Sequence, residues 1–157
     1  MKSLPNLLVI DTEDHNWFKI FENTTINGSE LVIEQAQWKD LKVTSYSDSG
    51  VYVDLFPADA PIINTKQNEK RIFKTNFVLI RNVIKGPLPD QNFTNKLLGL
   101  VHGNLQSVNS LLSIYCCLER PIVYGELQKI STKLGKDKFE LIDQTFYSNY
   151  RTAIITP

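Results

Sequence analysis

The stretch that decides the fold is SVNSLLSIYCCLERPIVYGELQKISTKLGKDKFELIDQTFY, residues Ser107–Tyr147. Near the start of this stretch, Asn109 or Ser110 can cap a short helix that runs through Tyr115. Pro121 opens a second helix, because a proline lacks the N–H that would have no partner at that position, and Gly135 ends it. The apolar positions of this second helix recur at steps of four and three, which predicts one buried face: Val123, Leu127, Ile130 and Leu134.

The last part of this stretch, Phe139–Tyr147, is rich in aromatic and β-branched residues and predicts a strand. Upstream, several apolar runs lack the alternation of a half-exposed strand. Such runs are typical of strands that are covered on both faces of a parallel sheet. Asn6–Asp11 and Phe77–Arg81 are such runs, and further strands are expected over Glu30–Gln37 and the short Ser107-Val108.

Two further strand-like runs, Lys42–Ser47 and Val51–Phe56, are joined by Asp48-Ser49-Gly50 and predict an antiparallel β-hairpin. Helices are expected after Asp14, which would cap the first, and over Asn92–His102. Strands that alternate with helices indicate an α/β fold. We therefore predict a Rossmann-like, mostly parallel sheet with helices on both faces and an inserted antiparallel hairpin, all in one domain over residues 1–157.

Composition excludes several classes of function. Seventeen basic residues balance seventeen acidic ones, so no broad electrostatic footprint predicts a nucleic-acid partner. No apolar run approaches the ~20 residues that span a bilayer, and the start MKSLPNLL is too short for a signal peptide. The chain is therefore expected to be cytoplasmic and not secreted. The adjacent Cys116 and Cys117 are interpreted as small packing residues rather than a disulfide.

Motifs of catalysis and phosphate binding are missing. The turn after the first predicted strand is Asp11-Thr12-Glu13-Asp14-His15, which has three acids and no glycine to admit a pyrophosphate. We interpret these acids as an acidic start to a helix rather than a metal site. No serine or cysteine lies in a nucleophile motif. The sequence therefore predicts no catalytic residue, no metal site and no enzyme activity for this chain.

The candidate site follows from topology. Ligands of open parallel sheets gather at the carboxyl ends of the strands, where this chain would place Asp11, Arg81, Asn109 and Ser110. Arg81 is the most suggestive, because a charged residue that ends a buried strand usually has a specific partner. That partner is either a ligand or a structural carboxylate such as Asp11. The same edge is also a candidate surface for contacts between lobes.

Several of these segments resemble a known family in the same order along the chain. The most specific is Leu141–Tyr147 (LIDQTFY), and the others are Leu8–Asp11 (LVID), Val32–Ala36 (VIEQA), Phe77–Arg81 (FVLIR), Ser107–Ser110 (SVNS) and Lys133–Gly135 (KLG). Together they resemble the central conserved domain of the synapsins, the vesicle-associated phosphoproteins of nerve terminals. The similarity spans nearly the whole chain and is that of the smaller N-terminal, pre-ATP-grasp lobe.

The resemblance implies a function for a longer parent protein: association with synaptic vesicles and the cytoskeleton, vesicle clustering, and regulation of neurotransmitter secretion at the synapse. ATP with a divalent cation would bind to the ATP-grasp lobe, whose nucleotide-binding positions have no counterpart in this sequence. We therefore expect that domain to be absent and expect no cofactor here. The chain itself would contact its own ATP-grasp lobe and form homo-oligomers, such as dimers, through apolar helix faces at residues 93–101 and 111–115.

Two alternatives remain open. The chain is also compatible with the substrate-side N-terminal lobe of an ATP-grasp carboxylate–amine ligase, in which Arg81 and Asn109 would face a small acidic substrate. It is likewise compatible with a stand-alone interaction domain that has lost its partner lobe.

Overall fold

A computed structural model describes residues 5–55 and 71–149, and these form two compact units, Met1–Leu118 and Glu119–Pro157. The chain expected as a single domain is thus described one unit at a time. The first unit contains every strand found in the described residues. The second contains one helix and the segment that follows it.

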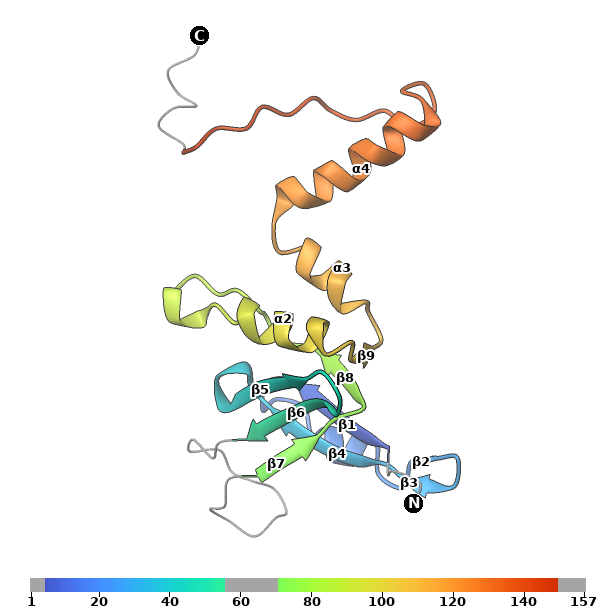
Figure 1. The fold of residues 1–157 in the computed structure, drawn as a ribbon, viewed down its shortest axis with the longest axis vertical. Coiled ribbons are helices and arrows are strands. Elements are labelled where there is room, and N and C mark those ends of the chain that lie inside the picture. Colours follow the sequence, from blue (N-terminus) through green and yellow to red (C-terminus); the bar gives the residue numbers. More distant parts are fainter. Residues whose placement is uncertain (1–4, 56–70, 150–157) are drawn as a thin grey trace. The chain divides into compact units, whose positions relative to one another are not determined.

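The centre of the first unit is strand β1 (Asn6–Ile10), which lies between two parallel neighbours. β4 (Val32–Ala36) pairs with one edge of β1 and β8 (Phe77–Ile80) with the other, and β9 (Gln106–Ser107) extends the sheet beyond β8. The resulting order β4-β1-β8-β9 confirms the predicted parallel sheet (Figure 1). Residues 7–10 are buried on both faces of this sheet, as their uninterrupted apolar pattern predicts.

A second sheet is antiparallel and occupies the connection from β4 to β8. A short 3₁₀ turn, η1 (Trp38–Asp40), leads from β4 into β5 (Leu41–Tyr46), which forms the predicted hairpin with β6 (Gly50–Leu55). The sequence did not reveal the third strand of this sheet, β7 (Arg71–Lys74), which pairs with β6. A third, two-stranded ribbon joins β2 (Thr25–Ile26) to β3 (Ser29–Glu30). Its Asn27-Gly28 turn has both residues at positive φ, as a tight hairpin requires.

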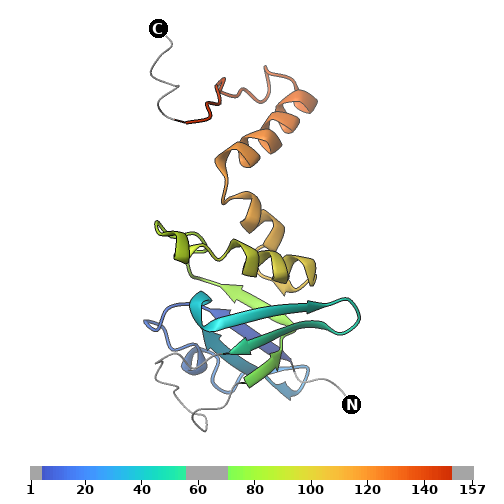
Figure 2. The same cartoon turned by 60° about the vertical axis from the view of Figure 1, so that its left-hand side comes forward.

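The hydrophobic core lies between the two larger sheets and a helix. Helix α2 (Thr94–His102) packs on β5 and covers this hairpin, as two views of the unit show (Figures 1 and 2). α2 is preceded by the 3₁₀ turn η2 (Pro89–Gln91). The core draws on the parallel sheet, the antiparallel sheet and α2, through residues that include Leu8, Ile10, Val78, Val51, Val53, Leu97 and Leu100. The predicted mixed α/β fold is confirmed.

Two short helices flank this core. Helix α1 (Trp17–Ile20) contacts β4, and its N-cap is Asn16, whose side chain accepts a hydrogen bond from the Lys19 N–H. The prediction of Asp14 as the cap was wrong by two residues. Helix α3 (Leu111–Cys116) packs against α2, and Ser110 caps it, as predicted.

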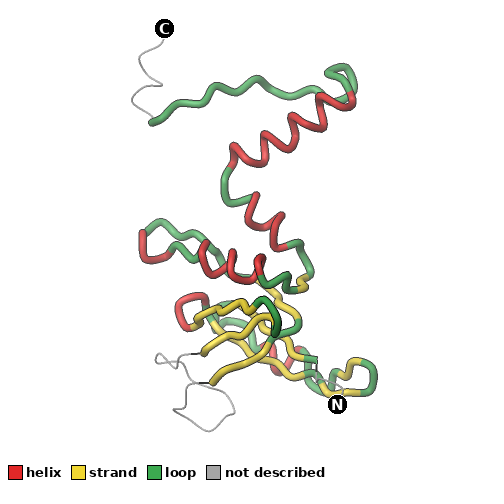
Figure 3. The backbone as a smooth tube through the Cα atoms, in the orientation of Figure 1, coloured by secondary structure: helices red, strands yellow, loops and turns green. Residues whose placement is uncertain are grey.

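The second unit departs from the sequence prediction in one respect. Helix α4 (Arg120–Leu134) has Pro121 in its first turn and ends at Gly135, with φ of 88°, as expected. The prediction of a strand over Phe139–Tyr147 was wrong: among the described residues this segment has no strand partner and is drawn as loop (Figure 3). Its carbonyls bond to side chains of α4 instead, Phe139 O to Ser131 Oγ and Ile142 O to Tyr124 Oη.

The close packing where α2 ends against the hairpin predicts that adding a methyl group at Gly103 lowers the stability of the fold. A Cβ at Gly103 would lie 2.1 Å from Cγ2 of Val51, which is only 2% exposed, and 3.0 Å from Ser45 Oγ. Gly103→Ala should therefore lower the free energy of unfolding by about 1–3 kcal/mol, measured by urea denaturation.

Gly125 in α4 provides the matched control, because a Cβ there meets no atom within 4 Å. Gly125→Ala should stabilise its helix by about 0.5–1 kcal/mol through helix propensity and leave the first unit unchanged. Equal effects of the two substitutions would contradict the described packing.

Candidate functional site

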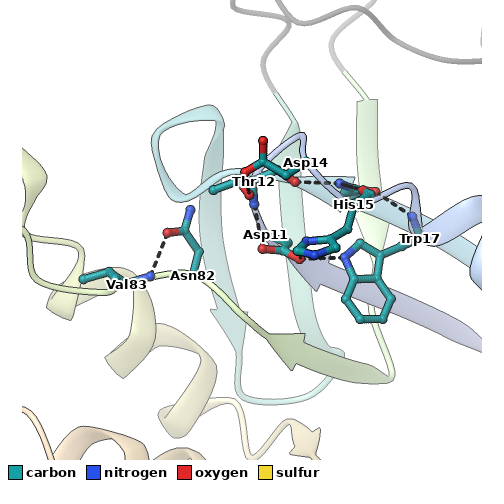
Figure 4. A network of polar contacts seen from close by, with 8 residues as sticks. Asp11, Thr12, Asp14, His15, Trp17, Asn82 and Val83 are labelled. Atoms are coloured by element: carbon teal, nitrogen blue, oxygen red, sulfur yellow. Dashed lines mark hydrogen bonds and ion pairs between the residues drawn. The ribbon is translucent and has the colours of Figure 1, made fainter.

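The carboxylate of Asp11 organises the turn that follows β1. The Asp11 side chain is only 5% exposed, its Oδ2 accepts a hydrogen bond from Trp17 Nε1 at 2.8 Å, and the same oxygen lies 3.2 Å from His15 Nδ1. Its Oδ1 accepts from the Thr12 backbone N–H at 2.8 Å. Figure 4 shows these side chains converging on the one carboxylate at the end of the strand. Both of its oxygens are thus occupied by groups of the same turn.

Gln35 of β4 ties this turn to the neighbouring strand. Its side-chain amide donates to the carbonyls of Thr12 and His15, at 3.0 and 2.8 Å, and its Oε1 accepts from the Trp17 N–H at 3.2 Å. A single side chain therefore pairs three backbone groups of the turn that have no partner in a strand or helix. The acidic turn is a structural element, but it precedes α1: the N-cap is Asn16 and the first turn of the helix contains no acid, contrary to the interpretation of these acids as the start of the helix. Among the described residues no group of three or more His, Cys, Asp or Glu side chains is arranged to hold a metal ion.

Arg81 does not serve as the partner of Asp11. Its side chain is exposed, and within the described part of the chain no carboxylate pairs with it. Its backbone N–H continues the sheet by donating to Ile10 O at 2.8 Å. The structural partner that the sequence suggested for Arg81 is thus not Asp11, whose two carboxylate oxygens both bond to groups of its own turn.

The other two candidate residues lie after β9, at the same edge of the sheet. Ser110 Oγ accepts from the Ser113 N–H at 3.3 Å and is thereby committed to capping α3. The carbonyl of Asn109 accepts from Ser107 Oγ at 2.6 Å, while its exposed side-chain amide makes no hydrogen bond to another described residue. The strand order places β1, β8 and β9 side by side, so all four candidates follow neighbouring parallel strands. Only Arg81 and Asn109 have side-chain groups available to a ligand.

A groove lies at the ends of β8 and β9, within the first unit. Its volume is about 690 Å³. One wall is the loop over residues 82–85 and the other is formed by Asn109 and α3. The lining residues are Asn82, Val83, Ile84, Lys85, Asn109, Ser113, Ile114, Cys117 and Leu118. Of the four predicted site residues, the groove contains Asn109 alone. Asn82 and Ser113 could not be predicted as groove residues, because an isolated asparagine or serine carries no distinctive pattern.

A second polar cluster, at the carboxyl end of β4, was not anticipated from the sequence. Lys96 Nζ donates to the Trp38 carbonyl at 2.5 Å and lies 5.3 Å from the centre of the Phe93 ring. Desolvation by burial lowers the pKa of Lys96 and raises the pKa of Asp40, and their opposite charges partly offset both shifts. Trp38 Nε1 and Asp40 Oδ1 are buried without a hydrogen-bond partner in the described structure. This cluster joins η1 to α2 in the core.

The fold and this edge define a class of protein: a mixed α/β lobe with a parallel four-stranded sheet. Comparison with known proteins makes the assignment specific. Residues 1–107 match the model of the synapsin pre-ATP-grasp domain, and residues 109–157 match the model of the synapsin ATP-binding domain. The chain is 35% identical over 146 residues to Synapsin of Drosophila melanogaster. The chain therefore belongs to the synapsin family.

The extent of these matches matters for function. The match to the Drosophila protein covers 92% of this chain and 14% of that protein. The change from one family model to the other, between residues 107 and 109, falls directly after β9. The part that matches the ATP-binding domain therefore begins with α3 and α4, so this chain contains the start of a region that the sequence interpretation had expected to be absent.

The described residues do not form a site that fits a triphosphate. The turn after β1 has no glycine, and its carboxylates would repel phosphate. In the part that matches the ATP-binding domain, Lys129 is paired with Glu126 at 2.5 Å on the surface of α4. The remaining described lysines of that part, Lys133, Lys136 and Lys138, are exposed and follow no strand. No chemical step is therefore assigned to a nucleotide in this chain.

The hydrogen bonds that the Asp11 carboxylate accepts allow us to predict the effect of replacing it with the isosteric asparagine. Asp11→Asn places an N–H₂ group where an oxygen now accepts, so that group faces either the Thr12 N–H or the Trp17 Nε1–H. The free energy of unfolding should fall by about 1–3 kcal/mol, measured by urea denaturation.

The matched control is Asp14→Asn. Asp14 is exposed and accepts only from Thr12 Oγ1, so its substitution should change the free energy of unfolding by about 0.5 kcal/mol or less. If the two substitutions were equally mild, Asp11 would be free for another role, such as ligand binding.

Proposed function

We propose that this chain acts as part of a synapsin-like, synaptic-vesicle-associated protein that regulates vesicle clustering and neurotransmitter release. Family membership supports this function, and the vesicle, cytoskeleton and cytoplasmic location follow from the resemblance of the sequence to that family. Within the described residues no helix is long and apolar enough to cross a membrane.

The contribution of the first unit itself is structural: it self-associates and packs against an ATP-binding lobe. One observation carries this proposal. Three large apolar side chains are exposed around the carboxyl ends of β8 and β9, namely Val83 (68%), Val108 (69%) and Leu112 (57%). We name these three residues the edge patch. Exposed apolar residues that are neighbours in a folded protein indicate an interaction surface.

The structure changes which helix face supports this role. The apolar face of residues 93–101 was expected to mediate contacts between copies, but Leu97 and Leu100 are fully buried in the core of the first unit. The face of residues 111–115 is divided, since Leu111 is buried and Leu112 is exposed. The proposal therefore rests on the edge patch and not on α2.

A substitution in the edge patch tests the proposed role. Val108→Ser combined with Leu112→Ser should abolish self-association in sedimentation velocity and reduce the clustering of purified synaptic vesicles in light scattering, because both side chains lose their apolar area. The control is Ile72→Ser on β7, where Ile72 is 65% exposed on the antiparallel sheet, and this variant should behave as the unmodified chain. A chain that is monomeric at every concentration and clusters no vesicles would exclude the role.

A second prediction concerns the cofactor. Because the described residues form no cradle for phosphate, we propose that the chain alone does not bind ATP. Isothermal titration calorimetry with ATP and either Mg²⁺ or Ca²⁺ should show no heat of binding. Saturable binding with a dissociation constant of about 1–100 µM would contradict this proposal and would place a nucleotide site within the chain.

The ligase remains a second candidate, favoured by one observation: Asn109 lines a groove at the carboxyl edge of the sheet. The exposed Arg81, however, is not among the residues that line this groove. Membership of the synapsin family favours the vesicle-associated role over the ligase.

A further inference from the structure

The turn between β2 and β3 places an asparagine directly before a glycine on the surface of the first unit. Asn27 and Gly28 are both exposed and both have positive φ, 53° and 77°. A Cβ added to Gly28 would meet no atom within 4 Å, so the surroundings of the turn are open. The Asn27 carboxamide and the Gly28 N–H make no hydrogen bond to another described residue. Both groups are therefore available for reaction.

The ribbon that holds this turn is small. β2 and β3 are joined by two residue pairs, and one further backbone bond runs from the Leu31 N–H to Thr24 O at 3.1 Å. None of the four residues of these strands is buried, and the apolar Ile26 is 44% exposed. A two-stranded ribbon with no buried face is only marginally stable, so it opens at a low cost in free energy. It lies at the margin of the first unit (Figures 1 and 3).

An asparagine before a glycine can lose its side-chain amide without an enzyme. Hydroxide removes the proton of the Gly28 N–H, and this nitrogen attacks Cγ of Asn27. The new bond joins Gly28 N to Cγ, the bond from Cγ to Nδ2 breaks, and the leaving nitrogen takes a proton from water to depart as ammonia, which restores the hydroxide. Water then opens either C–N bond of the resulting cyclic imide. One product is aspartate, and the other is isoaspartate, in which the backbone runs through Cγ.

The closed turn opposes this attack. The imide ring needs the nitrogen of the next residue on the same side as Cβ about the Cα–C bond, whereas a residue in the left-handed region holds that nitrogen nearly opposite its Cβ. Asn27 has this backbone conformation in the turn. Rotation about its Cα–C bond requires that the ribbon opens. The low stability of the ribbon therefore decides whether the reaction occurs in the folded chain.

We propose that Asn27 is a site of spontaneous deamidation, with water as the second reactant, and that opening of the β2–β3 ribbon controls its rate. The modification converts a neutral side chain into a carboxylate, and its isoaspartate product adds one atom to the backbone of a two-residue turn. This inference goes beyond the proposed function, since neither β2 nor β3 contributes a residue to the edge patch.

Two other asparagines in the described chain provide internal controls. Asn23 (φ 61°) and Asn104 (φ 50°) are also exposed and left-handed. Their following residues, Thr24 and Leu105, carry side chains, and the N–H groups of both donate to backbone carbonyls at 3.0 and 3.2 Å. No other asparagine of the sequence precedes a glycine. Exposure and positive φ are thus shared by all three residues, and only Asn27 has an unhindered and unbonded nitrogen after it.

The test incubates the full chain in mildly alkaline buffer and follows each asparagine by peptide mapping and mass spectrometry, which detects the replacement of –NH₂ by –OH. Asn27 should deamidate about tenfold faster than Asn23 or Asn104, or more, and should yield both aspartate and isoaspartate. Equal rates at the three positions would overturn the proposal.

A synthetic peptide of residues 24–31, which has no sheet to hold it, gives the rate without the ribbon. The chain should react more slowly than this peptide, and urea below the unfolding transition should raise its rate toward that of the peptide. Complete deamidation of the peptide while Asn27 of the chain stays intact would show that the turn blocks the reaction and would overturn the proposal. Equal rates in the chain and the peptide would overturn control by the ribbon.

Asn27→Asp is the matched control for charge, because an Asp-Gly pair also suits this turn and adds the same carboxylate without lengthening the backbone. In nuclear magnetic resonance spectra, the purified isoaspartate form should lose the cross-strand contact between Thr25 and Glu30, whereas Asn27→Asp should keep it. Both forms should self-associate as the unmodified chain does, so failure of the edge patch and failure of this site are distinguishable. An isoaspartate form that retains the cross-strand contact would overturn the predicted effect on the turn.

Discussion

The fold depends on burying β1 on both of its faces. Leu8, Val9 and Ile10 have no exposed surface, and the strand pairs in parallel with β4 and β8. Full burial of one such side chain stabilises a fold by about 1.5–3 kcal/mol, but it requires that every backbone N–H and C=O of the strand finds a partner. Two parallel neighbours meet that requirement. Connections must then cross from one end of the sheet to the other, which brings the helices and the second sheet over its faces.

This constraint also decides where the chemistry of the lobe is located. Parallel strands all end at one edge, so the residues after β1, β8 and β9 meet there although they lie nearly a hundred positions apart in the sequence. The two parts of this edge differ in how their polar side chains are bonded. After β1 the polar groups bond to one another and close the turn around Asp11. After β8 and β9 the side chains of Asn82 and Asn109 retain bonding capacity and line a groove.

The sequence predicted well those helices and strands whose local residue pattern matches the burial of their side chains in the structure. The apolar runs at β1 and β8, the hairpin of β5 and β6, and the limits of α4 at Pro121 and Gly135 all follow from patterns of a few residues. One error concerned the N-cap of α1, where two nearby residues are both suited to that position. Asn16 and Asp14 are both good helix caps, and in the structure Asn16 caps α1 while the Asp14 carboxylate accepts from Thr12 Oγ1.

The segment Phe139–Tyr147 shows a different limit. Its composition favours a strand, but a strand exists only where another backbone pairs with it, and no composition encodes that partner. Here the carbonyls of Phe139 and Ile142 bond to side chains of α4, and the ring of Phe146 lies 6.1 Å from that of Tyr124. The proximity of the buried Asp40 to the half-buried Lys96 escaped prediction for a related reason, because the two residues are fifty-six positions apart in the sequence and come together only through the packing of α2.

The position of the family boundary connects these observations. The pre-ATP-grasp match ends at Ser107, which is also the last residue of β9, and the ATP-binding match begins at Asn109. One wall of the groove is therefore formed by the loop after β8 and the other by the first residues of the next domain match. The groove thus lies at the boundary between the two family matches, beside the start of α3, whose Leu111 belongs to the core.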